Sequence, residues 1–210
     1  MKWRVLQISD SAFPTGAFAH SNGLEAAARL DEVDLDAFVD SAIWQAGHGA
    51  LPFVSAAWAR DLGELDALAD AMLVNPVANR ASRAQGRALA ATCARVFDVT
   101  AVDDACRARL LRVHHAPAFG ALTRALGVDR REALETYLHG ALRAVTSAAV
   151  RLGLVGPNEA QRMTAARAPL LDRVIATCGD LPAEDAAQAA PIADLLAAAH
   201  DHLDARIFAS

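Results

Sequence analysis

No segment of this 210-residue chain alternates apolar and polar residues with period two over more than a few positions, and runs of β-branched residues are nearly absent. Alanine, leucine, arginine and aspartate dominate the composition instead. Alanine, leucine and arginine are strong helix formers, and apolar residues three and four positions apart form the buried face of an amphipathic helix. The sequence therefore predicts an all-α fold.

Capping residues and prolines divide this pattern into about ten helices joined by short loops. Asp34, Asn75 and Asp129 each precede an apolar, helix-forming run and have the side chain that a helix N-cap requires. The run after Asn75 extends to Phe97, and the run after Asp129 extends to about Leu152. We therefore expect long helices over these two runs.

Other boundaries rest on glycine, proline and acidic residues. Gly47 and Gly49 are expected to end the helix that follows Asp34, and Pro52 fits the first turn of a new helix. Acidic residues favour a helix over residues 103–113, and the last apolar run predicts a helix over about residues 183–205.

The length of the chain suits one large domain, and no change in composition marks a linker. We expect a single helical domain over residues 1–210. Its first part, about residues 1–20, contains Pro14 and Gly16 and is predicted to be rich in loops. Its end, about residues 204–210, is predicted to be a tail.

Composition and charge argue against several classes of protein. The net charge of −5 and the lack of a basic run do not suit a nucleic-acid-binding protein. No stretch approaches the length of uncharged apolar sequence that a membrane span needs. The three cysteines lie far apart without a Cys-x-x-Cys pair, and the first residues lack the apolar core of a signal peptide. We therefore expect a cytoplasmic protein.

The chain lacks the common motifs of catalysis and nucleotide binding. It contains neither a Gly-x-Ser-x-Gly nucleophile motif nor a phosphate-binding loop, and Lys2 is its one lysine. Its acidic pairs stand at predicted helix starts, where the helix dipole accounts for them. The sequence thus predicts a protein that is not an enzyme and has no cofactor.

Seven histidines are the remaining candidates for metal ligands. His114 and His115 are adjacent, and His200 and His202 are two positions apart, so a helix would separate the members of each pair. Surface or interface histidines are the favoured interpretation, and we assign no metal ligand. A weak site shared across an oligomer remains an alternative.

Residues 6–25 form an entry segment that combines turn-forming residues with two phenylalanines, Phe13 and Phe18. Aromatic side chains in a loop must pack on something. One interpretation is a loop that folds over its own core. The other is a rigid loop that presents Phe18 and His20 to a partner.

Residues 6–25 resemble the N-terminal signature of the urease accessory protein UreF family at nearly every position. Four further segments are similar to later family elements and follow in the same order. They are the arginine- and glycine-containing run 80–87, the His-x-x-x-Phe-Gly segment 115–120, the run 157–162 and the tail 205–210. The resemblance covers about the whole chain.

The resemblance implies an all-α protein that forms a homodimer and is not itself an enzyme. It implies a scaffold that bridges the accessory protein UreD (also called UreH) and the GTPase UreG while nickel is inserted into the urease apoprotein. The alternative is a helical metallochaperone that holds nickel itself through histidines.

The family motifs assign three residues to partner binding: Phe18 in the entry signature, and Arg206 and Phe208 in the tail. In the family the tail becomes ordered against the UreD-type partner. The guanidinium of Arg206 could donate several hydrogen bonds there. His20 occupies the signature position two residues after Phe18, where many relatives have tyrosine, and Phe18 could instead belong to the core.

Two further candidates for partner binding lie on predicted helices. Arg80, Arg83 and Arg87 are spaced so that they share one helix face, which is either a solvated basic face, a docking stripe or a set of ion pairs across the dimer. Tyr137 is the one tyrosine and lies in the apolar stripe of the helix after Asp129. Burial in the core or the dimer is favoured for it, with the GTPase contact as the alternative.

Overall fold

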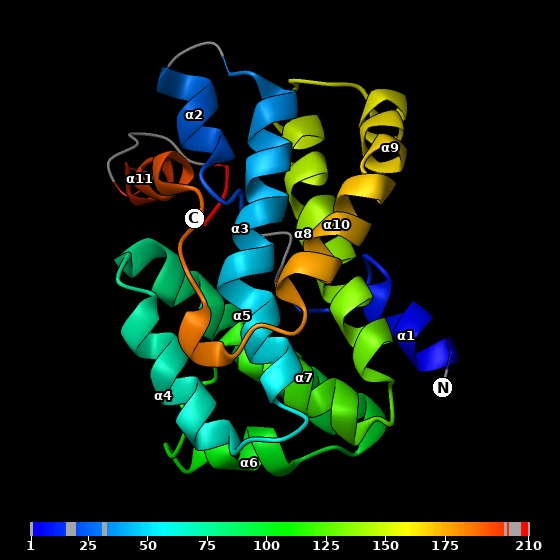
Figure 1. Cartoon of the computed structure of the whole chain (residues 1–210), viewed down its shortest axis with the longest axis vertical. Coiled ribbons are helices and arrows are strands. Elements are labelled where there is room, and N and C mark those ends of the chain that lie inside the picture. The colour runs from blue at the N-terminus through cyan, green and yellow to red at the C-terminus, as the bar shows by residue number, and fades with distance from the viewer. Residues whose placement is uncertain (1, 16–19, 31–32, 200, 202–206, 210) are drawn as a thin grey trace.

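The computed structural model describes residues 2–15, 20–30, 33–199, 201 and 207–209. These residues form eleven α-helices and one 3-10 turn, and none of them lies in a strand, so the all-α prediction is confirmed. The elements, shown in Figure 1, are α1 (Lys2–Ser9), α2 (Leu24–Leu30), α3 (Leu35–Ala56), α4 (Leu62–Met72), α5 (Pro76–Phe97), α6 (Ala101–Arg107), α7 (His115–Ala125), α8 (Arg130–Arg151), α9 (Pro157–Ala166), α10 (Ala168–Cys178), η2 (Ala183–Asp185) and α11 (Pro191–Ala199).

The N-caps predicted at Asp34, Asn75 and Asp129 are confirmed. The side chains of Asp34, Asn75 and Asp129 each accept a backbone N–H of the following first turn at 2.8–3.0 Å. Each cap satisfies a donor that the helix itself leaves unpaired, which contributes about 1 kcal/mol. These boundaries were predictable because the cap and its partner lie within three residues of each other.

The predicted break at Gly47, Gly49 and Pro52 is wrong, because α3 continues through all three residues. Inside a helix, Pro52 cannot donate a hydrogen bond to the carbonyl four residues earlier. That carbonyl belongs to His48, and it accepts instead from the backbone N–H of Ala187 at 3.1 Å. A distant segment of the chain thus supplies the hydrogen bond that proline removes.

Gly47 lets α3 and α10 approach closely. A Cβ placed on Gly47 would lie 2.3 Å from Cγ1 of Val174, which is too close for any side chain. Glycine costs about 1 kcal/mol in a helix interior. Packing on the neighbouring helix offsets that cost, so the glycine marks a helix crossing and not a helix end.

Two other boundaries also differ from the predictions. The region 1–20, predicted to be rich in loops, contains α1, where Arg4 donates to the carbonyl of Leu126 at 3.0 Å and Arg143 of α8 donates to the carbonyl of Ser9. Helix α6 ends at Arg107, short of residue 113. The spacing of residues along the chain predicts neither these contacts between distant residues nor the loop that follows α6.

The end of the chain is less helical than predicted. Residues 186–190 are not helical, and α11 begins only at Pro191. The side chain of Gln45 in α3 accepts from the backbone N–H of Ala190 at 2.8 Å, and the His48 carbonyl holds Ala187 nearby. Helix α3 therefore fixes this segment in an extended path between η2 and α11.

One continuous apolar core joins the helices. Helix α3 runs through the middle of the molecule and packs against α7, α8 and α10, while α5 packs against α7 (Figure 1). Helix α11 lies against α2 and α5, and α1 lies against α8. Among the described helices, none is long and apolar enough to cross a membrane.

Candidate functional site

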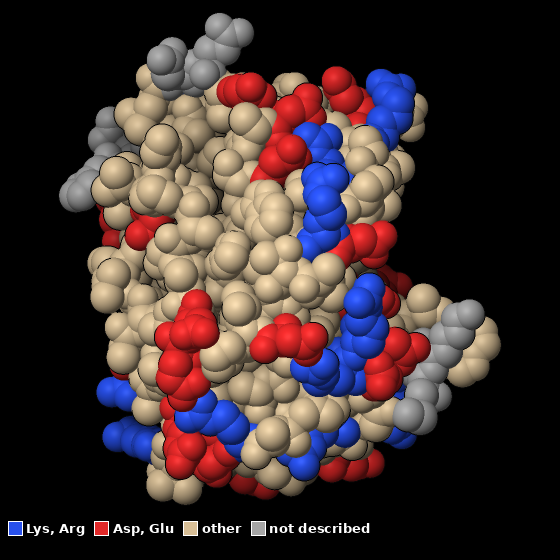
Figure 2. Space-filling view, in the orientation of Figure 1, with Lys and Arg blue, Asp and Glu red and all other residues tan. Residues whose placement is uncertain are grey.

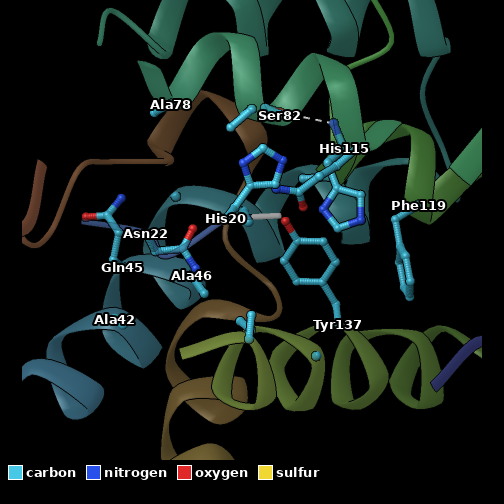
Figure 3. Close-up of a pocket in the computed structure, with 18 of the residues that line it drawn as sticks. His20, Asn22, Ala42, Gln45, Ala46, Ala78, Ser82, His115, Phe119 and Tyr137 are labelled. Carbon is cyan, nitrogen blue, oxygen red and sulfur yellow. Dashed lines mark hydrogen bonds between the residues drawn. The ribbon is translucent and has the colours of Figure 1, made fainter. Parts of the chain in front are cut away.

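A cavity of about 300 Å³ lies among α3, α5, α7 and α8. Its walls are made largely of alanine and glycine, including Ala46, Ala78, Ala81 and Gly140. Side chains this small leave space that longer aliphatic groups would fill. Figure 3 shows His20, His115 and Tyr137 together on one side of this space.

His115 and Tyr137 form an aromatic group at the cavity wall with Phe119. The ring centres of His115 and Tyr137 are 5.2 Å apart, and Tyr137 meets Phe119 edge-on at the same distance. Burial lowers the pKa of His115 to about 4, helped by the charge of nearby His20. Burial also raises the pKa of Tyr137. At neutral pH the cavity wall therefore offers an uncharged imidazole and an uncharged phenol.

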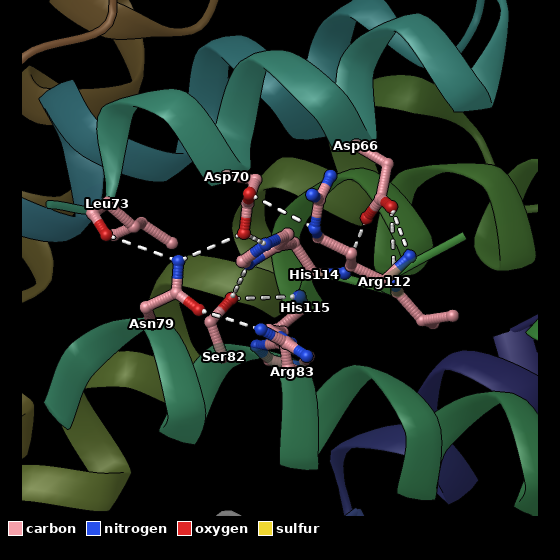
Figure 4. A network of polar contacts seen from close by, with 10 residues as sticks. Asp66, Asp70, Leu73, Asn79, Ser82, Arg83, Arg112, His114 and His115 are labelled. Carbon is pink, nitrogen blue, oxygen red and sulfur yellow. Dashed lines mark hydrogen bonds and ion pairs between the residues drawn. The ribbon is translucent and has the colours of Figure 1, made fainter. Parts of the chain in front are cut away.

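A buried carboxylate fixes the backbone just before α7. Asp66 of α4 accepts hydrogen bonds from three consecutive N–H groups, those of Arg112, Val113 and His114, at 2.6, 3.2 and 2.7 Å (Figure 4). Val113 has φ +63°, which is a strained conformation for a β-branched residue. The carboxylate stabilises this turn, and the turn places His115 at the first position of α7.

The imidazole of His114 lines the cavity and is fully buried. Its Nε2 lies 3.0 Å from Oδ1 of Asp70, and its Nδ1 lies 3.2 Å from Oγ of Ser82. Ser82 also accepts from the backbone N–H of His115 at 3.1 Å. Burial lowers the pKa of His114, and Asp70 opposes that shift. Through Asp70 of α4 and Ser82 of α5, the two ring nitrogens of His114 hold the start of α7 in place.

Sequence reasoning did not single out Asp66 and Asp70, which organise this network. Both lie inside α4, where an acidic residue resembles any solvated helical position. The available signal was the resemblance of segments 80–87 and 115–120, which contain Ser82 and His115, to elements of the family. That resemblance pointed to both segments, but it did not show that side chains of α4 bind the start of α7.

The described residues contain no group of three or more His, Cys, Asp or Glu side chains placed to hold a metal ion together. His20 and His115 line the same cavity as His114. His200 and His202 lie outside the described residues.

A second cluster joins the two ends of the chain. The carboxylate of Glu25, fully buried at the start of α2, accepts from the backbone N–H of Ile207 at 2.8 Å and from that of Phe208 at 3.1 Å. Arg29 donates to the same carboxylate at 3.1 Å. The guanidinium of Arg151 stacks on the Phe208 ring, 4.2 Å from its centre.

These contacts favour the docked position of the tail. Burying the Phe208 side chain, which is 5% exposed, contributes about 1.5–3 kcal/mol. Each hydrogen bond to a charged acceptor contributes about 1.5–3 kcal/mol, and the cation–π contact about 0.5–2 kcal/mol. Ordering two terminal residues costs about 1–2 kcal/mol each in backbone entropy.

The remaining sequence candidates lie in different environments. Arg80 is exposed, and its Nη2 forms an ion pair with Oδ2 of Asp201 at 2.6 Å. Arg83 is half-buried, and its Nη1 lies 3.4 Å from Oδ1 of Asn79. Phe18 and Arg206 lie outside the described residues. The structure therefore brings His20 and Tyr137 together at the cavity and places Phe208 against the entry segment.

The fold and these two clusters define an all-α protein whose C-terminal segment packs on its own N-terminal signature residues.

The family model described as UreF matches residues 30–168. Nearly the whole chain is similar to three curated relatives. The urease accessory protein F of Arabidopsis thaliana is 36% identical over 100% of this chain and 93% of that protein. The urease accessory protein F of Oryza sativa subsp. indica is 34% identical over 98% and 84%, and the urease accessory protein UreF of Cereibacter sphaeroides is 35% identical over 97% and 96%. The chain belongs to the UreF family.

Proposed function

We propose that this chain is a non-enzymatic scaffold of urease maturation that bridges a UreD/UreH-type protein and a UreG-type GTPase during nickel insertion into apo-urease. The observation that carries the proposal is the full-length similarity to relatives named as urease accessory proteins. The absence of a phosphate-binding loop from the sequence agrees with a division of labour in which the GTPase supplies the nucleotide chemistry. The scaffold acts as a cytoplasmic homodimer, which presents each partner surface twice.

The proposed surface for the UreD-type protein surrounds the C-terminal segment. Ile207 is 52% exposed, and the apolar side chains of Leu30, Ile192 and Leu195 on α2 and α11 are more exposed still. Figure 2 shows few charged side chains over this part of the molecule. Exposed apolar side chains with little charge around them are typical of a protein–protein interface.

The other predicted site residues take different parts in this proposal. Phe18 and Arg206 are proposed to bind the UreD-type protein, and Phe208 holds the tail on the protein from within. Arg80 and Arg83 on α5 supply a polar edge for a second partner. His20 of the entry segment and Tyr137 of α8 act from inside, because both line the cavity.

Co-purification tests the proposal. The chain is mixed with the UreD-type and UreG-type proteins of the same source and analysed by size exclusion with light scattering, beside a variant that ends after Asp204. A ternary complex with the intact chain and its loss in the variant are expected. A complex that survives the truncation would contradict the assignment of Arg206 and Phe208, and no complex at all from folded components would contradict the scaffold.

The alternative function is a nickel-binding chaperone that holds the ion through histidines. The observation in its favour is that His20 and His115 line one cavity and that His115 stays uncharged at neutral pH, the form that binds metals. Calorimetry with Ni²⁺ and the isolated chain separates the two proposals. Tight binding of one ion per chain that His115→Gln abolishes would support the alternative, and no heat of binding would remove it.

A further inference from the structure

Residues 22–25 of the entry segment contact the end of the chain at two separate places. Gly23 lies against α11, and Glu25 lies against residues 207–208. The resemblance implied that Phe18 of the entry segment lies near Arg206 of the tail, but it assigned no contact to residues 22–25. The structure places the two directly together.

Gly23 provides the first contact. It has φ +87°, and a Cβ on it would lie 2.9 Å from the backbone nitrogen of Ala197 and 3.0 Å from the carbonyl oxygen of Ala193. The backbone of α11 therefore rests directly on the backbone at Gly23. Any side chain at this position would push α11 away, in addition to being strained by the positive φ.

Glu25 provides the second contact, through a carboxylate that is fully buried. A buried carboxylate is costly unless hydrogen-bond donors surround it. Two of the donors to Glu25 are the consecutive backbone N–H groups of Ile207 and Phe208. Without the C-terminal segment, this carboxylate would lose both of them.

The backbone donors of Ile207 and Phe208 let Glu25 set the position of the C-terminal segment. Because Glu25 accepts from two consecutive main-chain N–H groups, it fixes the path and register of the segment at residues 207–208. In that register Phe208 is 5% exposed and points into the core beneath Arg151, whereas Ile207 is 52% exposed. Glu25 thus decides which face of the C-terminal segment is buried and which face is left for a partner.

We propose that residues 22–25 are an intramolecular receptor for the C-terminal segment, with Glu25 as the positioning residue that holds residues 207–208 in register. The receptor part rests only on the contacts within this chain. Its consequence for binding rests on the proposed function: the docked register presents the tail surface that the UreD-type protein recognises.

Amide hydrogen exchange of the full chain tests the receptor. Glu25→Gln keeps the shape of the side chain but replaces one acceptor oxygen with a donor group, which faces a backbone N–H. We expect the Ile207 and Phe208 amides to exchange at least tenfold faster in this variant. Glu159→Gln is the matched control, since Glu159 is exposed in the first turn of α9. Unchanged exchange in Glu25→Gln would overturn the proposal.

A double-mutant comparison separates positioning from general destabilisation. If Glu25 acts through the tail, Glu25→Gln weakens binding of the UreD-type protein to the level of the chain that ends after Asp204. In the chain that ends after Asp204, Glu25→Gln is expected to have no further effect on binding of the UreD-type protein. A further tenfold loss in the truncated chain would overturn the positioning role.

The two proposals fail in different ways. Faster exchange at residues 207–208 with unaltered binding of the UreD-type protein would keep Glu25 as the anchor and overturn the role of the tail in the proposed function. Slow exchange in Glu25→Gln together with weakened binding would overturn the receptor and leave the scaffold intact.

Discussion

Arg151 at the end of α8 stacks its guanidinium on the ring of Phe208, 4.2 Å from the ring centre. This contact ties the last described residues to the central helices of the molecule. It also accounts for an aromatic residue so close to the end of the chain, where an exposed ring would have no structural role.

Phe208→Ala is expected to lower the free energy of unfolding by about 1–3 kcal/mol, because it removes the buried ring and its cation–π contact. Urea denaturation at neutral pH measures this change. Ile207→Ala is the neighbouring control and should cost less than about 0.5 kcal/mol, since half of its side chain is already in water. Equal effects of the two substitutions would contradict the docked register.

Asp66→Asn is expected to destabilise the chain by about 2–4 kcal/mol, because a neutral amide cannot accept from three adjacent N–H groups as the carboxylate does. The comparison is Asp104→Asn on the exposed side of α6, which should change stability by less than about 0.5 kcal/mol. Thermal unfolding of both variants beside the parent chain gives the result. A mild effect at Asp66 would mean that the strained turn at Val113 holds without the carboxylate.

The burial of His115 predicts a loss of stability in mild acid. Its pKa is lowered to about 4 in the folded chain, so between about pH 6.5 and pH 4 the unfolded chain binds the proton more readily. Stability is therefore complete above the unfolded pKa and falls as the pH drops through this window. Among the described residues, His20, Tyr137 and Phe119 face His115, and none of these three side chains is acidic.

Urea denaturation at pH 7 and pH 5 tests this prediction. We expect a decrease of about 2 kcal/mol from His115, with His114 and His139 acting in the same direction because their pKa values are lowered too. His115→Gln should reduce the dependence on pH by about that amount. An unchanged dependence in the variant would show that His115 titrates normally.

Gly23→Ala is expected to loosen α11, since the new Cβ would press on the backbone of Ala193 and Ala197. The positive φ alone costs about 1–2 kcal/mol for an L-residue. Gly140→Ala is the control: a Cβ there meets no atom within 4 Å, so alanine should stabilise α8 by about 0.5–1 kcal/mol. Hydrogen exchange along α11 reports the first effect, and thermal unfolding reports both. Stabilisation by both substitutions would contradict the packing of α11 on Gly23.

The sequence was informative wherever the responsible interaction is local. The N-caps Asp34, Asn75 and Asp129 act within one helical turn, so their residue types predicted the helix starts correctly. The all-α class followed from composition and spacing for the same reason. Phe208 was singled out through the family motif, and the structure shows its burial.

The sequence failed where distant segments decide the outcome. Pro52 is tolerated inside α3 because Ala187 takes over as donor to the carbonyl of His48. Similarly, the entry signature ends at Glu25 without assigning it a role, and only the tertiary structure shows that it accepts from the tail. No pattern of spacing contains these pairings, because they depend on contacts between segments far apart in the chain.

Activation of urease in cells tests the central claim most directly. The urease structural proteins are expressed with the UreD-type and UreG-type proteins and with the intact chain, the chain that ends after Asp204, or no such chain. The nickel content and activity of the purified urease are then measured. The account predicts nickel-loaded, active urease with the intact chain and nickel-poor, inactive urease in the other two cases. Equal nickel content in all three would contradict it.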